Sequence, residues 1–170
     1  MRAEILSVGT ELLLGQIVDT NAAYIARALA DLGIDVFFKQ TVGDNPQRIQ
    51  EALRLALSRA DAVLITGGLG PTEDDLTVDA VAAALGEELV EDAAVVEHVR
   101  AFFAARGRRP TSNVFKQALV PRSARVIPNG RGTAPGIHLE RDGRMIFIMP
   151  GVPYEMDAMM REYVLPALRE

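Results

Sequence analysis

The sequence contains no cysteine, which excludes both a disulfide framework and thiolate chemistry. It also lacks an apolar run of membrane-spanning length, and the apolar stretch in residues 1–6 is too short for a signal peptide. Nothing in the sequence therefore points to an oxidising compartment or to a membrane. We expect a soluble cytoplasmic protein that has no membrane partner.

Histidine and lysine are also scarce, with two residues of each kind. His98 and His138 do not form a two-histidine zinc motif, so we expect both to be structural. An ammonium contact to a phosphate would have to come from Lys39 or Lys116, and otherwise an arginine such as Arg131 would take that role. The sequence therefore offers few lysines that could bind a phosphate.

The chain carries more negative than positive charge. The formal net charge is -5 and the pI is near 5.1, whereas a non-specific nucleic-acid binder needs a broad basic surface. No nucleic-acid partner is expected. With 170 residues, of which 49% are hydrophobic, the chain is long enough for one well-covered core, and we expect a single domain over residues 1–170.

Apolar strands and amphipathic helices alternate along the first half of the chain. Residues 5–8, 34–42 and 62–65 have the pattern of buried strands, and helical spacing follows each of them, last at 76–85. This βα rhythm predicts an α/β fold with a mainly parallel sheet that is covered on both faces.

The second half of the chain departs from this rhythm. Residues 91–106 predict a long helix and 112–119 a short one, so we expect a helical insertion at about 91–119. A short strand at 125–127 precedes a loop rich in Gly and Pro at 128–136. Asp142-Gly143 predicts a late antiparallel hairpin, and a last helix is expected from about Tyr154.

One segment, TGGLGPTEDDLT at residues 66–77, joins a buried strand to a helix through glycines and then carboxylates. Such a turn lies at the carboxyl end of a strand, where backbone N–H groups can hold an anion. It is not a Walker A loop, because Pro71-Thr72 follows Gly70. Glu73 occupies the place where a dinucleotide fingerprint needs glycine or alanine, so NAD is not expected.

Acidic residues follow two of the predicted strands, and a parallel sheet can bring their carboxylates together. Glu11 follows the first strand, and Glu73, Asp74 and Asp75 follow the third. Hard oxygen ligands suit Mg²⁺ or Mn²⁺, which commonly bridge one or two carboxylates and substrate phosphates. The alternative is that Asp74 and Asp75 only complement the positive end of a helix, worth about 0.3–1 kcal/mol each.

Four motifs in combination are specific. They are GTELLLGQIVDTN at 9–21, GGLGPTEDDLT at 67–77, GTAPG at 132–136 and PGVPYEM at 150–156. Together they resemble the amino-terminal domain of the competence/damage-inducible CinA family, over essentially the whole chain. The resemblance implies a molybdopterin-binding-protein-like fold, which is a three-layer α/β/α sandwich, and self-association as a homodimer or higher homo-oligomer.

The resemblance implies a metal-dependent ADP-ribose pyrophosphatase that gives AMP and ribose 5-phosphate, with Mg²⁺ or Mn²⁺ and without haem, flavin or NAD. Glu11 and Asp75 would hold the metal or position water, and Asp74 would assist them. A nucleotide is the expected small-molecule partner. The residues expected to bind it are Thr10, Asp19, Asn21, Gly67, Gly68, Gly70, Asn113, Lys116, Gly132, Thr133, Gly136, Gly151 and Glu155.

Two other functions stay open. Asp75 falls where molybdenum-cofactor enzymes carry a catalytic aspartate, although Leu69 and Pro71 depart from their usual Gly-Gly-Thr-Gly stretch, so molybdopterin binding or adenylyl transfer is an alternative. A non-catalytic nucleotide-binding module is another. Longer members of the family carry a further domain that deamidates nicotinamide mononucleotide, and we do not assign that activity to these 170 residues.

Overall fold

The computed structural model describes residues 1–169. The first half of the chain forms β1 (Arg2–Val8), α1 (Thr10–Leu13), α2 (Thr20–Asp31), β2 (Asp35–Val42), α3 (Pro46–Arg59), β3 (Ala62–Thr66) and α4 (Thr77–Leu85). The second half forms β4 (Leu89–Glu91), α5 (Ala93–Ala104), the 3₁₀ helix η1 (Ser112–Ala118), β5 (Leu119–Pro121), β6 (Arg125–Ile127), β7 (Gly136–Arg141), β8 (Arg144–Met149), α6 (Pro153–Met159), the π-helical turn η2 (Met160–Val164) and α7 (Leu165–Ala167).

The main sheet has the strand order β2-β1-β3-β8-β7-β6. Strands β2, β1, β3 and β8 run parallel to one another, whereas β7 is antiparallel to both β8 and β6. The β7–β8 hairpin turns at Asp142 and Gly143, whose φ angles of 50° and 75° are those of the tight turn that suits twisted strands. The predicted parallel sheet with a late antiparallel hairpin is confirmed.

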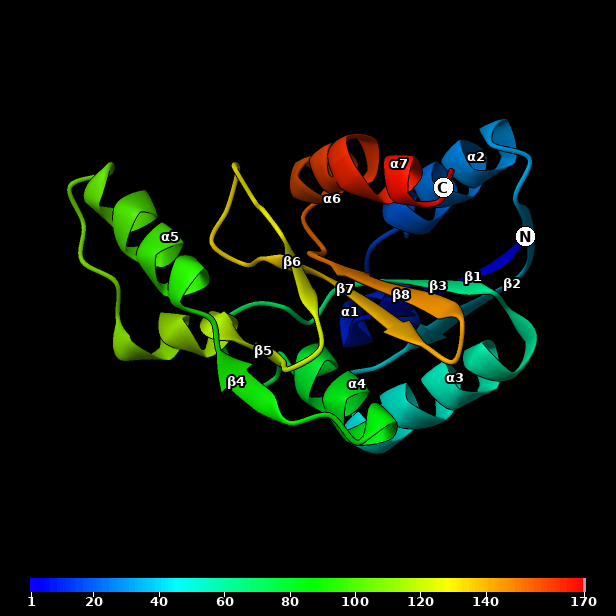
Figure 1. Ribbon diagram of the computed structural model, residues 1–170, viewed down its shortest axis with the longest axis horizontal. Coiled ribbons are helices and arrows are strands. Elements are labelled where there is room, and N and C mark those ends of the chain that lie inside the picture. The colour runs from blue at the N-terminus through cyan, green and yellow to red at the C-terminus, as the bar shows by residue number, and fades with distance from the viewer. Residues whose placement is uncertain (170) are drawn as a thin grey trace.

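Helices cover both faces of this sheet, which gives the three layers seen in Figure 1. Because successive strand residues point to opposite faces, Val63 and Ile65 of β3 pack with α3 and α4. Ala62 and Leu64 pack on the other side with α2 and the α6–α7 segment. The expected α/β/α sandwich is therefore confirmed.

The segment after α4 differs from the expectation in its details. The helix predicted to start at residue 91 begins at Ala93, because Leu89–Glu91 pairs antiparallel with Leu119–Pro121 in a separate small sheet. The short helix predicted for 112–119 is a 3₁₀ helix that ends at Ala118. Helix α5 stands away from the main sheet (Figure 1) and packs with η1 in an apolar cluster of its own.

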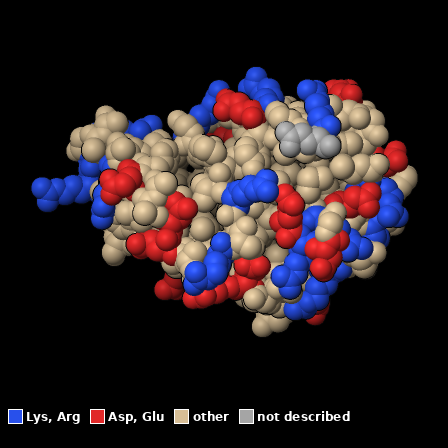
Figure 2. Space-filling model, viewed as in Figure 1, with Lys and Arg blue, Asp and Glu red and all other residues tan. Residues whose placement is uncertain are grey.

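Charges of both signs are interspersed over the face shown in Figure 2, with no broad basic area on that face of the described chain. Among residues 1–169, no helix is long and apolar enough to cross a membrane.

Candidate functional site

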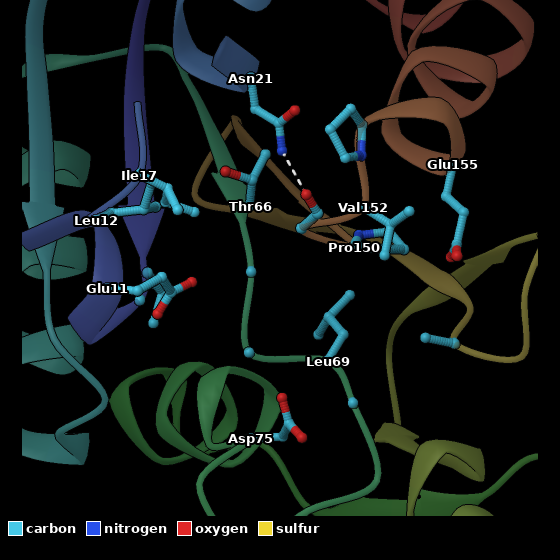
Figure 3. A pocket seen from close by; sticks show the side chains of 18 of the residues that line it. Glu11, Leu12, Ile17, Asn21, Thr66, Leu69, Asp75, Pro150, Val152 and Glu155 are labelled. Carbon is cyan, nitrogen blue, oxygen red and sulfur yellow. Dashed lines mark hydrogen bonds between the residues drawn. The ribbon is translucent and has the colours of Figure 1, made fainter. Parts of the chain in front are cut away.

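A cavity of about 550 Å³ opens at the carboxyl ends of β1, β3 and β8. Its wall comes from the segments that follow these three strands, at residues 8–12, 66–70 and 150–153, and from the N-terminal ends of α2 and α6 (Figure 3). The parallel strands bring these segments together because their carboxyl ends meet at one edge of the sheet.

Close contacts explain why the turn after β3 contains glycines. Gly67 has φ 97°, and a Cβ there would lie 2.1 Å from the carbonyl oxygen of Val8. Gly68 has φ 68°, and a Cβ there would lie 2.1 Å from Oγ1 of Thr77, which itself donates to the Gly67 carbonyl at 2.7 Å. A side chain at Gly67 would push the turn away from β1, and one at Gly68 would push it away from α4.

The same turn leaves backbone donors unused. The Gly67 N–H donates to the Met149 carbonyl at 3.1 Å, so Gly67 lines the cavity without offering its N–H. The N–H groups of Gly68, Leu69 and Gly70 donate to no other residue among 1–169. Residues 68–70 all line the cavity, and three successive N–H groups without a protein acceptor can bind an anion.

Asp75 folds back onto this turn. Its Oδ2 accepts hydrogen bonds from Thr72, at 2.9 Å from the backbone N and 2.6 Å from Oγ1. The carboxylate rests against Gly70, where a Cβ would lie 2.4 Å from Oδ2. Oδ1 accepts from no described residue, so Asp75 keeps one free oxygen at the cavity (Figure 3).

Two side chains of helix η1 donate hydrogen bonds to backbone carbonyls of the turn. Lys116 Nζ donates to the carbonyl of Asp75 at 2.6 Å and to that of Thr72 at 3.3 Å, and it lies 3.8 Å from Asp79. Gln117 Nε2 donates to the Leu69 carbonyl at 3.0 Å. Lys116 does not line the cavity, so its ammonium positions the turn.

Glu11 lies on α1 at the opposite wall of the cavity from Leu69 (Figure 3). Its carboxylate packs on Gly9, where a Cβ would lie 2.7 Å from Oε1. The neighbouring Thr10 exchanges hydrogen bonds with Asp44, whose Oδ2 accepts from the Thr10 hydroxyl at 2.9 Å. Asp44 lines the cavity, whereas Thr10 stands behind it.

The N-terminal end of α2 forms the upper wall in Figure 3. Asp19 caps the helix by accepting from the Ala22 N–H at 2.9 Å. Asn21 donates through Nδ2 to the Gly151 carbonyl at 2.8 Å, which joins α2 to the loop after β8. Behind this wall, a hydrogen bond from Tyr24 of α2 lowers the pKa of Asp157 of α6.

Glu155 enters the cavity from α6 and is buried. Asn129 Nδ2 donates to its Oε2 at 2.7 Å. Gly132 packs against the same carboxylate without lining the cavity, and Thr133 next to it does line the cavity.

The cavity gathers most of the predicted site residues. Those that line it are Glu11, Asp19, Asn21, Gly67, Gly68, Gly70, Asp74, Asp75, Thr133, Gly151 and Glu155. Those that do not are Thr10, Asn113, Lys116, Gly132 and Gly136. Asn113 is exposed on η1, and Gly136 is buried in β7, where a Cβ would lie 2.8 Å from the Met159 sulfur.

Four polar residues of the cavity wall were not among the predicted site residues, namely Thr20, Asp44, Thr66 and Gln117. Asp44 follows the end of β2, so the strand-end rule that selected Glu11 and Asp75 could have found it. Gln117 lies in η1, and no sequence signal indicated that η1 docks against the turn after β3. The apolar side chains of Leu12, Ile17 and Val18 also line the cavity.

The cavity is strongly acidic. Its lining carboxylates are Glu11, Asp19, Asp44, Asp74, Asp75 and Glu155. No Lys or Arg from residues 1–169 lines it. An anionic group could enter only with cations, because the uncompensated repulsion in a partly desolvated cleft would oppose it.

The donor set fits a hard divalent cation that shares its ligands with a substrate. Within the described chain, no group of three or more His, Cys, Asp and Glu residues could hold a metal by itself. Mg²⁺ is characteristically held by one or two carboxylates together with phosphate oxygens and water. Glu11 and Asp75 are two of the lining carboxylates that could supply such ligands.

Comparisons with known proteins match nearly the whole chain. A family model described as "Probable molybdopterin binding domain" matches residues 4–170. A CinA-like protein of Dictyoglomus turgidum is 52% identical over 168 residues, which are 99% of this chain and 41% of that protein. The chain thus spans about two fifths of the length of this curated relative.

Solved structures agree with the sequence matches. The protein CinA of Thermoplasma acidophilum, a protein of unknown function, has a TM-score of 0.85 and 39% identity over 94% of each chain. The molybdopterin biosynthesis enzyme MoaB of Thermus thermophilus has a TM-score of 0.64 and 26% identity, over 98% of this chain and 91% of that one.

Proposed function

The chain belongs to the family of probable molybdopterin binding domains and to its CinA-like members, and from this we propose that the cavity is an enzyme site for the phosphate end of a pterin or nucleotide ligand. The observation that carries the proposal is the turn after β3. It sets the three unused N–H groups of residues 68–70 beside the free oxygen of Asp75, in a cavity that Glu11 faces from the other side.

In this proposal one set of groups binds the phosphate and another set binds a cation. The N–H groups of Gly68, Leu69 and Gly70 bind phosphate oxygens and orient the phosphate. Asp75, oriented by Thr72, and Glu11 hold a divalent cation such as Mg²⁺ or Mn²⁺. When bound, the cation neutralises charge on the phosphate and acidifies a bound water.

Two reactions use these parts. The first is binding of molybdopterin with adenylyl transfer, and the family description and the MoaB neighbour support it, since both are named for molybdopterin. The second is hydrolysis of ADP-ribose to AMP and ribose 5-phosphate, which rests on the resemblance to CinA. None of the names given above mentions a pyrophosphatase, so the molybdopterin reaction is the better supported of the two.

The experiment tests both reactions on one protein preparation. The chain is incubated with Mg²⁺ and either ADP-ribose, or ATP and molybdopterin, and AMP or adenylylated pterin is measured. Asp75→Asn should abolish either product while the protein stays folded. Glu73→Gln is the matched control, because Glu73 is exposed in the same turn and does not line the cavity.

Each outcome assigns a function. Adenylylated pterin without AMP from ADP-ribose supports the transferase, and the reverse result supports the hydrolase. Binding of either ligand without turnover would assign a non-catalytic module. No binding and no turnover would refute the proposal.

A further inference from the structure

Glu155 is a buried carboxylate at the far end of the cavity from the metal-binding residues. It is 7% exposed, lies in the first turn of α6 and points into the cavity. Figure 3 shows it on the opposite side of the cavity from Glu11, with Val152 and Leu69 between them. The proposed phosphate chemistry makes no use of it.

The charge of Glu155 is only partly compensated. Asn129 donates one hydrogen bond to Oε2, and Oε1 accepts from no residue among 1–169. No salt bridge of the described chain includes Glu155. Each carboxylate oxygen can accept two hydrogen bonds, so both oxygens have room for a further donor. Oε1 is not among the fully buried unpaired atoms of the described chain, so it is open to the cavity and can meet a donor of a ligand.

The loop before β7 fixes the position of this carboxylate. A Cβ on Gly132 would lie 2.4 Å from Oε2 and 2.6 Å from Oε1, so the loop follows the carboxylate closely. His98 Nε2 holds the Gly132 carbonyl at 2.8 Å, and Asn129 Nδ2 also donates to the Ala134 carbonyl at 2.7 Å. The acceptor is therefore in place before a ligand arrives, which lowers the entropic cost of binding.

We assign no cation to this carboxylate, because the proposed cation and phosphate lie at the other end of the cavity and a phosphate would be repelled by Glu155. The remaining partners are uncharged N–H or O–H groups of a ligand, whose hydrogen bonds to a charged acceptor are strong.

We propose that Glu155 is the specificity residue of the cavity and accepts a pair of N–H or O–H donors from the part of the ligand that carries no phosphate. This inference rests on the proposed function, because it assumes that the phosphate end occupies the turn after β3. Two ligand parts offer such a pair, namely the amino-oxo edge of a pterin or guanine ring and the vicinal diol of a ribose.

The test compares ligands that differ only in these donors, in buffer with Mg²⁺. GDP and inosine diphosphate differ by one ring amino group, whereas ADP and 2′,3′-dideoxy-ADP differ by the diol. Dissociation constants are measured by calorimetry for wild type, Glu155→Gln and the control Glu162→Gln. Glu162 is exposed and lies in η2, directly beyond α6.

Wild type should bind the donor-rich member of one pair more tightly by about tenfold or more, the effect of one hydrogen bond to a charged group. The pair that shows the difference identifies the ligand part. Glu155→Gln should reduce the difference to about twofold, and Glu162→Gln should retain it. If Glu155→Gln does not fold, a wild type that discriminates neither pair still overturns the role of Glu155.

Inorganic diphosphate separates this inference from the proposed function. If diphosphate with Mg²⁺ does not bind wild type, the proposed function fails. If diphosphate binds but neither pair is discriminated, or if Glu155→Gln discriminates as wild type does, the role of Glu155 is overturned and the phosphate site stands.

Discussion

The contact between Gly70 and Asp75 offers a substitution that displaces the carboxylate without touching it. In Gly70→Ala the new Cβ would lie 2.4 Å from Asp75 Oδ2 and 2.9 Å from Oδ1 and Cγ, so the side chain must swing away. The φ of Gly70 is not in the left-handed region, so alanine adds no backbone strain.

The expected cost in stability is small. The displaced carboxylate loses its two hydrogen bonds to Thr72, which lie at the surface and contribute about 0.5 kcal/mol each. Alanine also restricts the unfolded chain, which returns about 0.4–1 kcal/mol. The free energy of unfolding should therefore change by less than about 1 kcal/mol, and Tm by less than about 4 °C.

The expected cost in binding is much larger, because Asp75 would leave the metal position. We expect the affinity for Mg²⁺ with diphosphate to fall by about 10–100-fold, as for other lost supports of metal ligands. Calorimetry measures the affinity and a thermal melt measures the stability. Gly130→Ala is the control, since a Cβ at Gly130 would meet nothing within 4 Å.

A double-mutant cycle tests whether Gly70→Ala acts through the displacement of Asp75. In an Asp75→Ala background the clash is absent, so Gly70→Ala should add little further loss. If Gly70→Ala costs as much in that background as in wild type, its effect comes from the turn itself, and the role given to Asp75 is wrong.

Lys116→Met removes two hydrogen bonds to the carbonyls of the turn and should weaken binding of Mg²⁺ with diphosphate by about fivefold or more, whereas Lys39→Met, at an exposed position, should leave the titration unchanged. Arg59→Met should lower the midpoint of urea denaturation, because Glu4 is 1% exposed and loses its cation, and a second change of Glu4 to Met should recover most of that loss. Burial lowers the pKa of His138, so the unfolded chain binds the proton first and stability should fall as pH drops below about 6.5. His138→Gln should flatten this decline between about pH 7.5 and 5.5, and an unchanged slope would contradict the assignment.

The arrangement of the main sheet could be predicted because local patterns determine it. Strand β3 is buried on both faces and reads as a continuous apolar run, and Gly33 and Gly86 end helices with left-handed φ angles. Glu11 and Asp75 could be assigned to one site because both follow parallel strands, whose carboxyl ends meet. These rules need no knowledge of distant contacts.

The rest depends on contacts between segments far apart in the chain. Strands β4 and β5 have three residues each, too few for a visible alternation, and they exist only because they pair with each other. Lys116 lies 41 residues from Asp75, so its donation to the turn follows from the docking of η1. The homo-oligomer and the cytoplasmic location expected from the sequence stay predictions.

The central claim is that Glu11, Asp75 and the N–H groups of residues 68–70 bind a cation and a phosphate together. Electron paramagnetic resonance of Mn²⁺, titrated into the protein with and without inorganic diphosphate, tests it directly. Because no described group of three carboxylates can hold the ion alone, binding should be weak without diphosphate and at least about tenfold tighter with it. Equal binding in the two titrations, or the same enhancement in Asp75→Asn, would contradict the claim.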